Sequence, residues 1–249
     1  MLDGLSLEGR RAVVTGGAGG IGSAIARDLD ALGAAVVVAD LNEPGAGEVA
    51  RSLRSGSAAT LDLTNPGAIE AFAAAVLDEG QVDILVNCAG WERIMPFLQS
   101  SSADWDRQIA INLRAPIQLC HLFLPGMVER GWGRVVNISS DAGRVGSTGE
   151  SVYSACKAGL LGLTKTLARE TARQGVTVNA VCPGPTDTPL LQEIKEKSPN
   201  LIEALKRGIP IGRLGEPRDV AAAVVFLVTP RAEYITGQTW SVNGGLNMV

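Results

Sequence analysis

The chain has 249 residues, of which 46% are hydrophobic and 19% charged, and its formal net charge is −4. This apolar fraction supports a large buried core and argues against disorder. The acidic balance argues against nucleic acid or an anionic membrane as the main partner. The amino-terminal residues show no signal-peptide pattern, and no apolar run reaches the roughly 18 residues of a membrane span. We therefore expect a cytoplasmic protein without a membrane partner.

Short runs rich in β-branched residues alternate with helical patterns, such as those over residues 21–33 and 66–80. The runs span residues 11–15, 34–40, 58–63, 83–90, 133–140, 176–184 and 239–245. Because they are apolar along their whole length, they fit a parallel sheet covered on both faces. Alternating strands and helices imply right-handed crossovers. The sequence therefore predicts an α/β fold, a Rossmann-type doubly wound parallel sheet of seven strands with helices on both faces, in a single domain over residues 1–249.

The first strand is followed by the stretch TGGAGGIG, residues 15–22, which opens a helix. Gly16, Gly20 and Gly22 let the chain turn sharply, approach a pyrophosphate closely and pack the helix against the strand. The helix that begins near Ile21 offers free N–H groups and the positive end of its dipole to phosphates. In this context the stretch predicts a dinucleotide-binding loop.

An acidic residue, Asp40, ends the second strand, and we expect Asp40 and the adjacent Leu41 to contact the cofactor. The position of Asp40 after the glycine loop is typical of an acid that binds the ribose 2′-hydroxyl. A 2′-phosphate would meet this carboxylate, and no Arg or Lys in the loop or just after Asp40 offsets the repulsion. The sequence therefore predicts NAD rather than NADP as the cofactor.

Asp62 and Leu63 follow the third strand and are expected at the cofactor site as well. Asp62 either accepts a hydrogen bond from the adenine amine or caps the helix that starts near Pro66. Both interpretations remain open from the sequence.

The main catalytic pattern joins Ser140, at the end of the fifth strand, to Tyr153 and Lys157 in the next helical segment. Residues four apart share a helix face, so Tyr153 and Lys157 can point together at the strand ends. The pKa of a free phenol is about 10, and a nearby cation lowers it toward the range in which a general acid–base works best. Ser140 would then hold the substrate oxygen by a hydrogen bond.

Taken together, these motifs resemble the short-chain dehydrogenase/reductase family over nearly the whole chain. The family's Asn-Asn-Ala-Gly motif appears here as NCAG, with a departure at Cys88 that we expect to be minor because backbone approach matters most there. Within this motif the resemblance implies cofactor contacts at Asn87, Ala89 and Gly90. It also selects Ser140 rather than Ser139, because 13 residues separate the family's serine from its tyrosine. The segment after the sixth strand would contact the cofactor through Pro183, Gly184, Thr186 and Thr188.

The same resemblance implies a mechanism. Tyr153 would exchange a proton with the alcohol or ketone oxygen, and Lys157 would lower the pKa of Tyr153 and bind the nicotinamide ribose. Asn112 corresponds to the family's active-site asparagine and would hold a water in a proton relay beyond Lys157. A protein that binds NAD without turnover, such as a redox sensor, would have no need of Asn112, Ser140, Tyr153 and Lys157 together.

The substrate pocket is expected to be built by the loops that follow Gly90 and Ser140 and by the segment after Gly184. Trp91 is either a platform for a ring or acyl chain or packing beneath its loop. Further candidate contacts to the substrate are Arg144, Glu150 and Leu190. Glu92 and Arg93, which follow Trp91, could also bind polar groups of the substrate. The alternative for the four charged residues is that they form a solvated rim around the pocket.

Stretches such as NCAGW and VCPGPTDTPLL resemble one branch of the family, the 2-hydroxycyclohexanecarboxyl-CoA dehydrogenases. This implies oxidation of a ring secondary alcohol, as a CoA thioester or a free hydroxy acid. The alternative is a 3-oxoacyl-thioester reductase, which shares the motifs, although Asp40 disfavours the NADPH that biosynthetic reduction usually uses.

The family resemblance also implies a homotetramer with interfaces on helices at 101–130 and 151–174 and on the carboxyl-terminal segment 237–249. The single histidine, His121, lies in an apolar run that predicts a buried helix, and we expect a structural or interface role for it. The four cysteines are far apart and form no CxxC motif, so neither a metal site nor a disulfide framework is expected.

Overall fold

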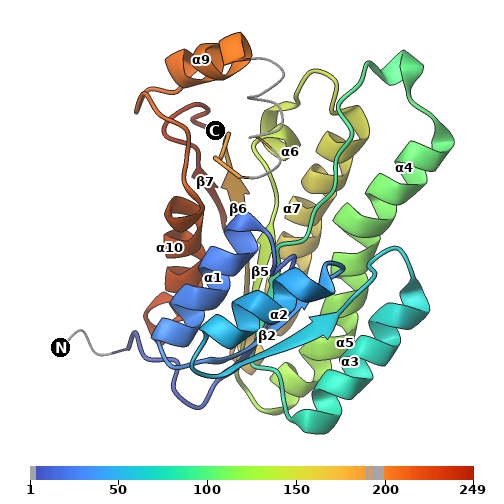
Figure 1. The fold of residues 1–249 in the computed structure, drawn as a ribbon. Coiled ribbons are helices and arrows are strands. Elements are labelled where there is room, and N and C mark those ends of the chain that lie inside the picture. The colour runs from blue at the N-terminus through green and yellow to red at the C-terminus, as the bar shows by residue number, and fades with distance from the viewer. Residues whose placement is uncertain (1–3, 189–190, 192–198) are drawn as a thin grey trace.

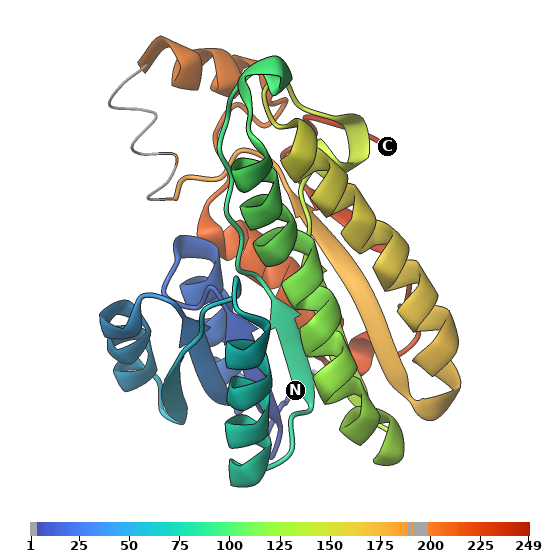
Figure 2. The same ribbon diagram turned by 90° about the vertical axis from the view of Figure 1, so that its right-hand side faces the viewer.

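The structure, a computed structural model, describes residues 4–188, 191 and 199–249. Seven parallel strands form one sheet in the order β3-β2-β1-β4-β5-β6-β7 (Figures 1 and 2). The strands are β1 (Arg11–Thr15), β2 (Ala35–Asp40), β3 (Gly56–Thr60), β4 (Ile84–Asn87), β5 (Gly133–Ile138), β6 (Val176–Pro183) and β7 (Thr239–Val242). The predicted seven-stranded doubly wound sheet is confirmed. Its strand order reverses between β1 and β4, which is where open α/β sheets bind their ligands.

Helices cover both faces of the sheet, with α1 and α10 on one face and α3, α5 and α7 on the other (Figures 1 and 2). The helices are α1 (Gly20–Ala31), α2 (Glu43–Ser52), α3 (Pro66–Glu79), α4 (Ser102–Ile109), α5 (Ala115–Glu129), α6 (Ala142–Val145), α7 (Ser151–Thr171), α9 (Pro199–Gly208) and α10 (Pro217–Val228). None of the helices in the described part of the chain is long and apolar enough to cross a membrane.

Two apolar clusters, one on each face, account for the continuous apolar runs in the strands. In β1 the side chains alternate, because Val14 packs with Ile25 of α1 while Val13 packs with Phe72 of α3 and Phe123 of α5. Since successive side chains of a strand point to opposite faces, a strand buried on both sides can be apolar at consecutive positions. The pattern that identified the strands in the sequence thus has a direct structural cause.

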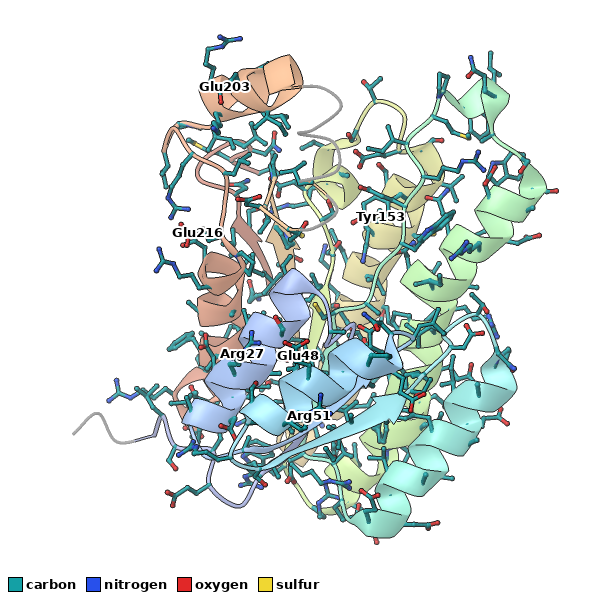
Figure 3. All side chains as sticks on the ribbon, in the orientation of Figure 1. Arg27, Glu48, Arg51, Tyr153, Glu203 and Glu216 are labelled. Atoms are coloured by element: carbon teal, nitrogen blue, oxygen red, sulfur yellow. The ribbon has the colours of Figure 1, made fainter. Side chains whose placement is uncertain are left out.

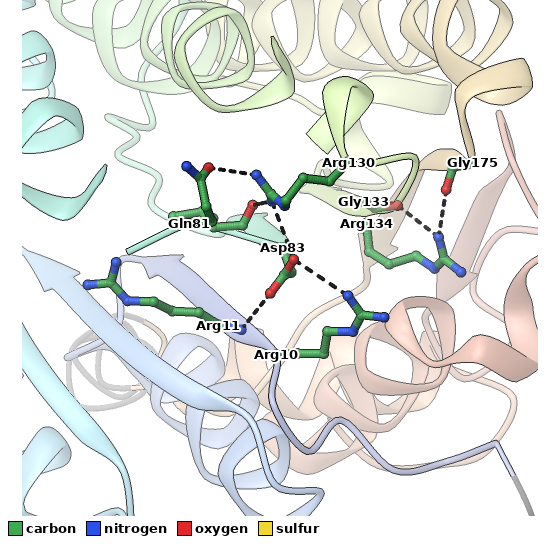
Figure 4. A network of polar contacts seen from close by, with 9 residues as sticks. Arg10, Arg11, Gln81, Asp83, Arg130, Gly133, Arg134 and Gly175 are labelled. Atoms are coloured by element: carbon green, nitrogen blue, oxygen red, sulfur yellow. Dashed lines mark hydrogen bonds and ion pairs between the residues drawn. The ribbon is translucent and has the colours of Figure 1, made fainter. Parts of the chain in front are cut away.

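The amino ends of the central strands are tied together by charged groups at the end of the sheet opposite the candidate site (Figure 4). The carboxylate of Asp83, just before β4, accepts from the backbone N–H of Arg11 at 3.1 Å and forms ion pairs with Arg130 at 3.3 Å and Arg10 at 3.6 Å. In β5 the guanidinium of Arg134 donates to the carbonyls of Gly133 and Gly175. These contacts fix the relative positions of β1, β4 and β5, whose other ends carry the site.

The helix expected over residues 101–130 is interrupted. Between α4 and α5 lies a π-helical turn, η2 (Ala110–Arg114), in which the N–H of Ala115 donates to the carbonyl of Ala110. Pro116 lacks an N–H, so it cannot donate to the carbonyl of Asn112 four residues earlier as an α-helix requires. The turn therefore carries Asn112, at a kind of irregularity that is frequent at functional sites.

Two further expectations are corrected. His121 is exposed on α5 rather than buried, because the apolar residues of that run, such as Phe123 and Leu124, turn to the opposite side of the helix. The third strand begins at Gly56 and ends at Thr60, earlier than the predicted 58–63, since β2 pairs with it from Val36 onward.

Candidate active site

The proposed catalytic side chains meet at the carboxyl ends of β5 and β6. Tyr153 lies on α7 in the upper half of the molecule as drawn (Figure 3). Its phenol shares a hydrogen bond with Ser140, and the Nζ atom of Lys157 lies 5.5 Å from the centroid of the Tyr153 ring. The neighbouring serine, Ser139, donates instead to the carbonyl of Lys157 at 2.8 Å. The geometry therefore places Ser140, and not Ser139, beside the phenol.

The ionisation of Tyr153 differs from the sequence expectation. Burial raises the pKa of the Tyr153 phenol, and the carboxylates of Glu92 and Glu150 add to the rise, while the hydrogen bond with Ser140 lowers it. Burial also lowers the pKa of Lys157 to about 8, because a buried ammonium loses its hydration. The prediction that Lys157 brings the pKa of Tyr153 down is thus wrong for this structure, in which desolvation is the larger effect.

Lys157 is completely enclosed and held in place. Its Nζ donates to the carbonyl of Ile138, the last residue of β5, at 2.9 Å. A Cβ built on Gly90 would lie 3.5 Å from this Nζ and 3.2 Å from the Oδ1 of Asn112. The absence of a side chain at Gly90 therefore lets the loop after β4 pass close to both groups.

Asn112 uses its side chain to hold that loop. Its Oδ1 accepts from the backbone N–H of Trp91 at 3.1 Å, and its Nδ2 donates to the carbonyl of Trp91 at 2.6 Å and to that of Gln108 at 3.0 Å. The side chain is fully buried. Both protons of the side-chain amide are thus used by protein carbonyls, and the role of Asn112 in a water relay stays a prediction.

The glycine loop has the shape that a dinucleotide requires. Gly16 has a φ of +66°, in the left-handed region that favours glycine, and a Cβ there would lie 2.7 Å from the Cα of Ala89. A Cβ on Gly22 would lie 2.1 Å from the carbonyl oxygen of Gly16. Helix α1 begins at Gly20 with Gly19 as its N-cap, and no side chain caps its first N–H groups. These groups remain available to a pyrophosphate, so the loop fits a nicotinamide dinucleotide.

Asp40 is fixed directly over this loop. Its Oδ2 accepts from the N–H of Ala18 at 3.0 Å and its Oδ1 accepts from the N–H of Asn42 at 2.9 Å. Leu41, the next residue, is 63% exposed. The carboxylate is thus held where the ribose of a dinucleotide bound to the loop would lie.

Of the two interpretations of Asp62, the structure excludes the helix cap. Helix α3 is capped by Asn65, whose Oδ1 accepts from the N–H groups of Gly67 and Ala68. Asp62 accepts from the N–H and the hydroxyl of Thr64 at 2.8 and 2.7 Å, which lowers the pKa of its carboxyl. Leu63 is buried in the core, so its side chain packs inside the protein.

The NCAG motif makes hydrogen bonds to the neighbouring strands β5 and β1. The Nδ2 of Asn87 donates to the Oδ1 of Asn137 in β5 at 2.8 Å, so this side chain faces the core and only its backbone borders the site. The N–H groups of Cys88 and Ala89 point to the hydroxyl of Thr15 in β1. Burial raises the pKa of the Cys88 thiol to about 12, which keeps it a neutral packing group.

The segment after β6 follows the sheet edge. The N–H of Gly184 donates to the carbonyl of Val242 at 3.0 Å, and the hydroxyl of Thr186 donates to the carbonyl of Gly184 at 2.9 Å. Pro183 ends β6, and Thr188 is half-buried beyond it. Leu190, a predicted substrate contact, lies outside the described residues.

Two loops bring the remaining substrate candidates together. The N–H of Met95 donates to the carbonyl of Gly149 at 2.9 Å, which joins the loop after β4 to the turn before α7. Glu150 consequently acts on Glu92, and burial together with Glu150 raises the pKa of Glu92 to about 7. The ring of Trp91 is covered by the guanidinium of Arg107 at 4.2 Å. The sequence showed Glu92 only as a possible rim residue, because its proximity to Glu150 depends on contacts between distant segments.

Arg144 does not take the predicted place. Its guanidinium donates to the hydroxyl of Ser241 at 2.8 Å and to the carbonyl of the last residue, Val249. Both partners belong to the carboxyl-terminal segment, so Arg144 binds the tail of the chain instead of presenting its charge to a substrate.

Comparisons with known proteins agree with this geometry. Residues 16–247 match the family model described as Enoyl-(Acyl carrier protein) reductase. The chain is 41% identical over 247 residues to the 3-oxoacyl-[acyl-carrier-protein] reductase FabG of Vibrio cholerae, covering 98% of this chain and 100% of the relative. It is 43% identical over 251 residues to the 2,3-dihydroxy-2,3-dihydro-p-cumate dehydrogenase of Pseudomonas putida, covering 98% of this chain and 97% of the relative.

A solved structure from Agrobacterium tumefaciens, described as that of a proposed gluconate dehydrogenase, superposes with a TM-score of 0.93 at 31% identity and covers 98% of both chains. The family model and the curated relatives extend over nearly the full length of the chain. The chain therefore belongs to the short-chain dehydrogenase/reductase family and is an oxidoreductase that acts on CH–OH groups with a nicotinamide cofactor.

Proposed function

We propose that this protein is an NADH-dependent reductase that converts a 3-oxoacyl thioester to the corresponding secondary alcohol. The observation that carries the reaction class is the arrangement of Tyr153, whose phenol is hydrogen-bonded with Ser140 while the buried Lys157 lies below its ring. A bound nicotinamide dinucleotide supplies the hydride in such a reaction. The protein's own residues have to position the carbonyl carbon and deliver a proton to its oxygen.

The proton would come from Tyr153. Because burial raises the pKa of this phenol, it stays protonated at neutral pH and is ready to donate to the oxygen of a ketone as negative charge develops there. Ser140 would hold the same oxygen by a second hydrogen bond, a preorganised contact that strengthens as the charge develops. At neutral pH the phenol therefore carries the proton that reduction of a ketone consumes.

Lys157 and Asn112 would support this group. Lys157, fixed by the carbonyl of Ile138, would bind the nicotinamide ribose. Asn112 keeps the backbone of Trp91 in place, and with it the wall of the site that faces Tyr153. The retention of all four groups in one place argues against a protein that merely senses NAD.

The choice of NADH rests on Asp40. Its carboxylate is anchored over the glycine loop by the N–H of Ala18, so it cannot easily swing away from a 2′-phosphate. Two negative groups in contact repel each other, and a ribose 2′-hydroxyl can instead donate to the carboxylate. We propose further cofactor contacts at Asp62 and along the segment from Pro183 to Thr188.

The 3-oxoacyl thioester is supported by the Vibrio cholerae relative, which is named for such a substrate, while the description of the family model supports only an acyl thioester. The carboxylate of Glu150, which acts on Tyr153, also disfavours a free carboxylate near the reacting carbon, whereas the thioester is neutral there. The choice is tested by the initial rates of NADH oxidation with three substrates: a linear 3-oxoacyl-CoA, 2-oxocyclohexanecarboxyl-CoA and the free 2-oxocyclohexanecarboxylic acid. Fastest turnover of either cyclic compound would overturn it.

A ring secondary alcohol is the second candidate substrate. The Pseudomonas putida relative acts, by its name, on a dihydrodiol of a ring. Neither relative named above is a 2-hydroxycyclohexanecarboxyl-CoA dehydrogenase. NAD reduction with a cyclic diol, measured at 340 nm, tests this candidate.

We also propose that the enzyme is cytoplasmic and a homotetramer. Sedimentation at micromolar concentration would test the oligomeric state.

A further inference from the structure

The carboxylate of Asp141, the residue that follows Ser140, is buried among side chains of the last nine residues of the chain. Its Oδ1 accepts from the hydroxyl of Ser241 at 2.8 Å, and its Oδ2 accepts from the Nδ2 atoms of Asn243 at 2.5 Å and Asn247 at 3.1 Å. Only 5% of the residue is exposed. All three donors are neutral, and all three lie about 100 residues further along the chain. We refer to Asp141, Ser241, Asn243 and Asn247 as the tail clamp.

Arg144 extends the tail clamp to the end of the chain. Its guanidinium donates to the same hydroxyl of Ser241 and to the carbonyl of Val249. In Figures 1 and 2 the carboxyl terminus lies close to the segment between β5 and α7, which contains α6. The carboxyl-terminal segment therefore packs against the first residues after Ser140.

The backbone around Ser140 is held from two sides. The N–H of Asp141 donates to the carbonyl of Pro183 at 3.2 Å, and the N–H of Ala142 donates to the hydroxyl oxygen of Ser140 at 3.1 Å. The turn that sets the direction of the Ser140 hydroxyl is thus hydrogen-bonded to β6 on one side and to the carboxyl-terminal segment on the other. A buried carboxylate that loses a donor is strongly destabilised, so the turn would move if the tail were removed.

We propose that the tail clamp is a positioning device, in which Asp141 aims the hydroxyl of Ser140 at Tyr153 by anchoring the turn 140–142 to the carboxyl terminus. This inference rests on the proposed function of Ser140 and deepens it. Asp141 does not reach the reacting atoms itself. Its effect on turnover passes through Ser140, and this distinguishes it from a residue that only stabilises the fold.

A double-mutant cycle tests the pathway. Ser140→Ala should lower kcat by about 100-fold, as the loss of one preorganised donor does, and Asp141→Ala should lower it by about tenfold through misalignment of the same donor. If Asp141 acts through Ser140, the double variant turns over no more slowly than Ser140→Ala. Multiplicative losses would overturn the proposal. Asp141→Asn, which keeps the acceptor for Ser241, should recover part of kcat with an unchanged Kd for NADH.

A second readout does not need activity. Hydrogen–deuterium exchange followed by mass spectrometry should speed up in Asp141→Ala at both segments, 139–145 and 243–249, while Asp78→Ala, a matched change at an exposed position of α3, changes neither. Unaltered exchange in both segments would contradict the clamp. If the exchange responds as expected but no 3-oxoacyl thioester or ring ketone is turned over, the proposed function fails and the anchoring of the tail stands.

Discussion

The Nζ of Lys157 lies 5.5 Å from the centroid of the Tyr153 ring and donates to the carbonyl of Ile138 at 2.9 Å. The end of β5 thus binds the ammonium of Lys157, and α7 carries Lys157 one helical turn after Tyr153. Because the whole arrangement is buried, desolvation is the largest influence on the pKa of both groups: it raises that of Tyr153 and lowers that of Lys157.

The glycine loop predicts a sharp difference between two glycine substitutions. A Cβ at Gly22 would lie 2.1 Å from the carbonyl of Gly16, whereas one at Gly162 in α7 would meet nothing within 4 Å. Gly22→Ala should weaken NADH binding by about tenfold or more, as overpacking of a tight contact does. Gly162→Ala should bind normally and be slightly more stable, since alanine favours a helix. Titration of NADH fluorescence and thermal unfolding compare them, and equal affinities would refute the loop assignment.

Asp40→Ala should change the preference between cofactors. Removal of the carboxylate takes away both the acceptor for a 2′-hydroxyl and the repulsion of a 2′-phosphate, so kcat/KM should fall with NADH and rise with NADPH. We expect the ratio of the two to shift by about tenfold or more. A wild-type protein that already prefers NADPH would show that the anchoring of Asp40 by Ala18 does not decide the cofactor.

Asn112→Ala should affect both stability and turnover. It leaves the N–H and carbonyl of Trp91 without their partner, a loss of about 1–3 kcal/mol for buried polar groups, and it frees the wall of the site. Asn65→Ala, which removes the cap of α3, is the matched control and should cost about 1 kcal/mol with kcat intact. Urea unfolding and steady-state rates measure both variants. Equal kcat in the two would show that the Asn112 contact is only structural.

Glu92 predicts a pH dependence of stability. Burial and Glu150 raise the pKa of its carboxyl from 4.5 to about 7, so between these values the folded protein holds a proton that the unfolded chain releases. The stabilisation is complete below about pH 4.5 and is lost as the pH rises through about 7. Glu92→Gln should remove this part of the slope between pH 5 and pH 8 in urea unfolding midpoints. An identical slope in both proteins would contradict the burial of this carboxylate.

Much of the fold could be predicted from the sequence because its signals are local. Strands β1 and β2 have continuous apolar runs, residues 12–14 and 35–39, and glycines at 16 and 22 have to be glycines for steric reasons that the structure shows directly. The pairing of Tyr153 with Lys157 also follows from helix geometry, whereas the choice of Ser140 over Ser139 came from the family resemblance. Pro116 was a local signal for the irregular turn at Asn112, although a proline at this position also fits the first turn of an ordinary α-helix.

The remainder depends on contacts between distant segments. Arg144 was expected at the substrate, but its partners lie 97 and 105 residues away in the chain, and no periodicity encodes them. The sequence left Asp62 open as a cap of α3 or a cofactor contact, and only the backbone shows that Asn65 caps this helix. The rise in the pKa of Tyr153 likewise depends on burial and on Glu92, which comes from another loop.

The most direct test of the account is the rate of NADH oxidation by Tyr153→Phe with a 3-oxoacyl-CoA substrate, with thermal unfolding and NADH affinity measured on the same protein. We predict a loss in kcat of about 100-fold or more, the size of a general-acid contribution, with binding and folding retained. Turnover close to that of the unmodified protein would show that the Tyr153 phenol does not donate the proton.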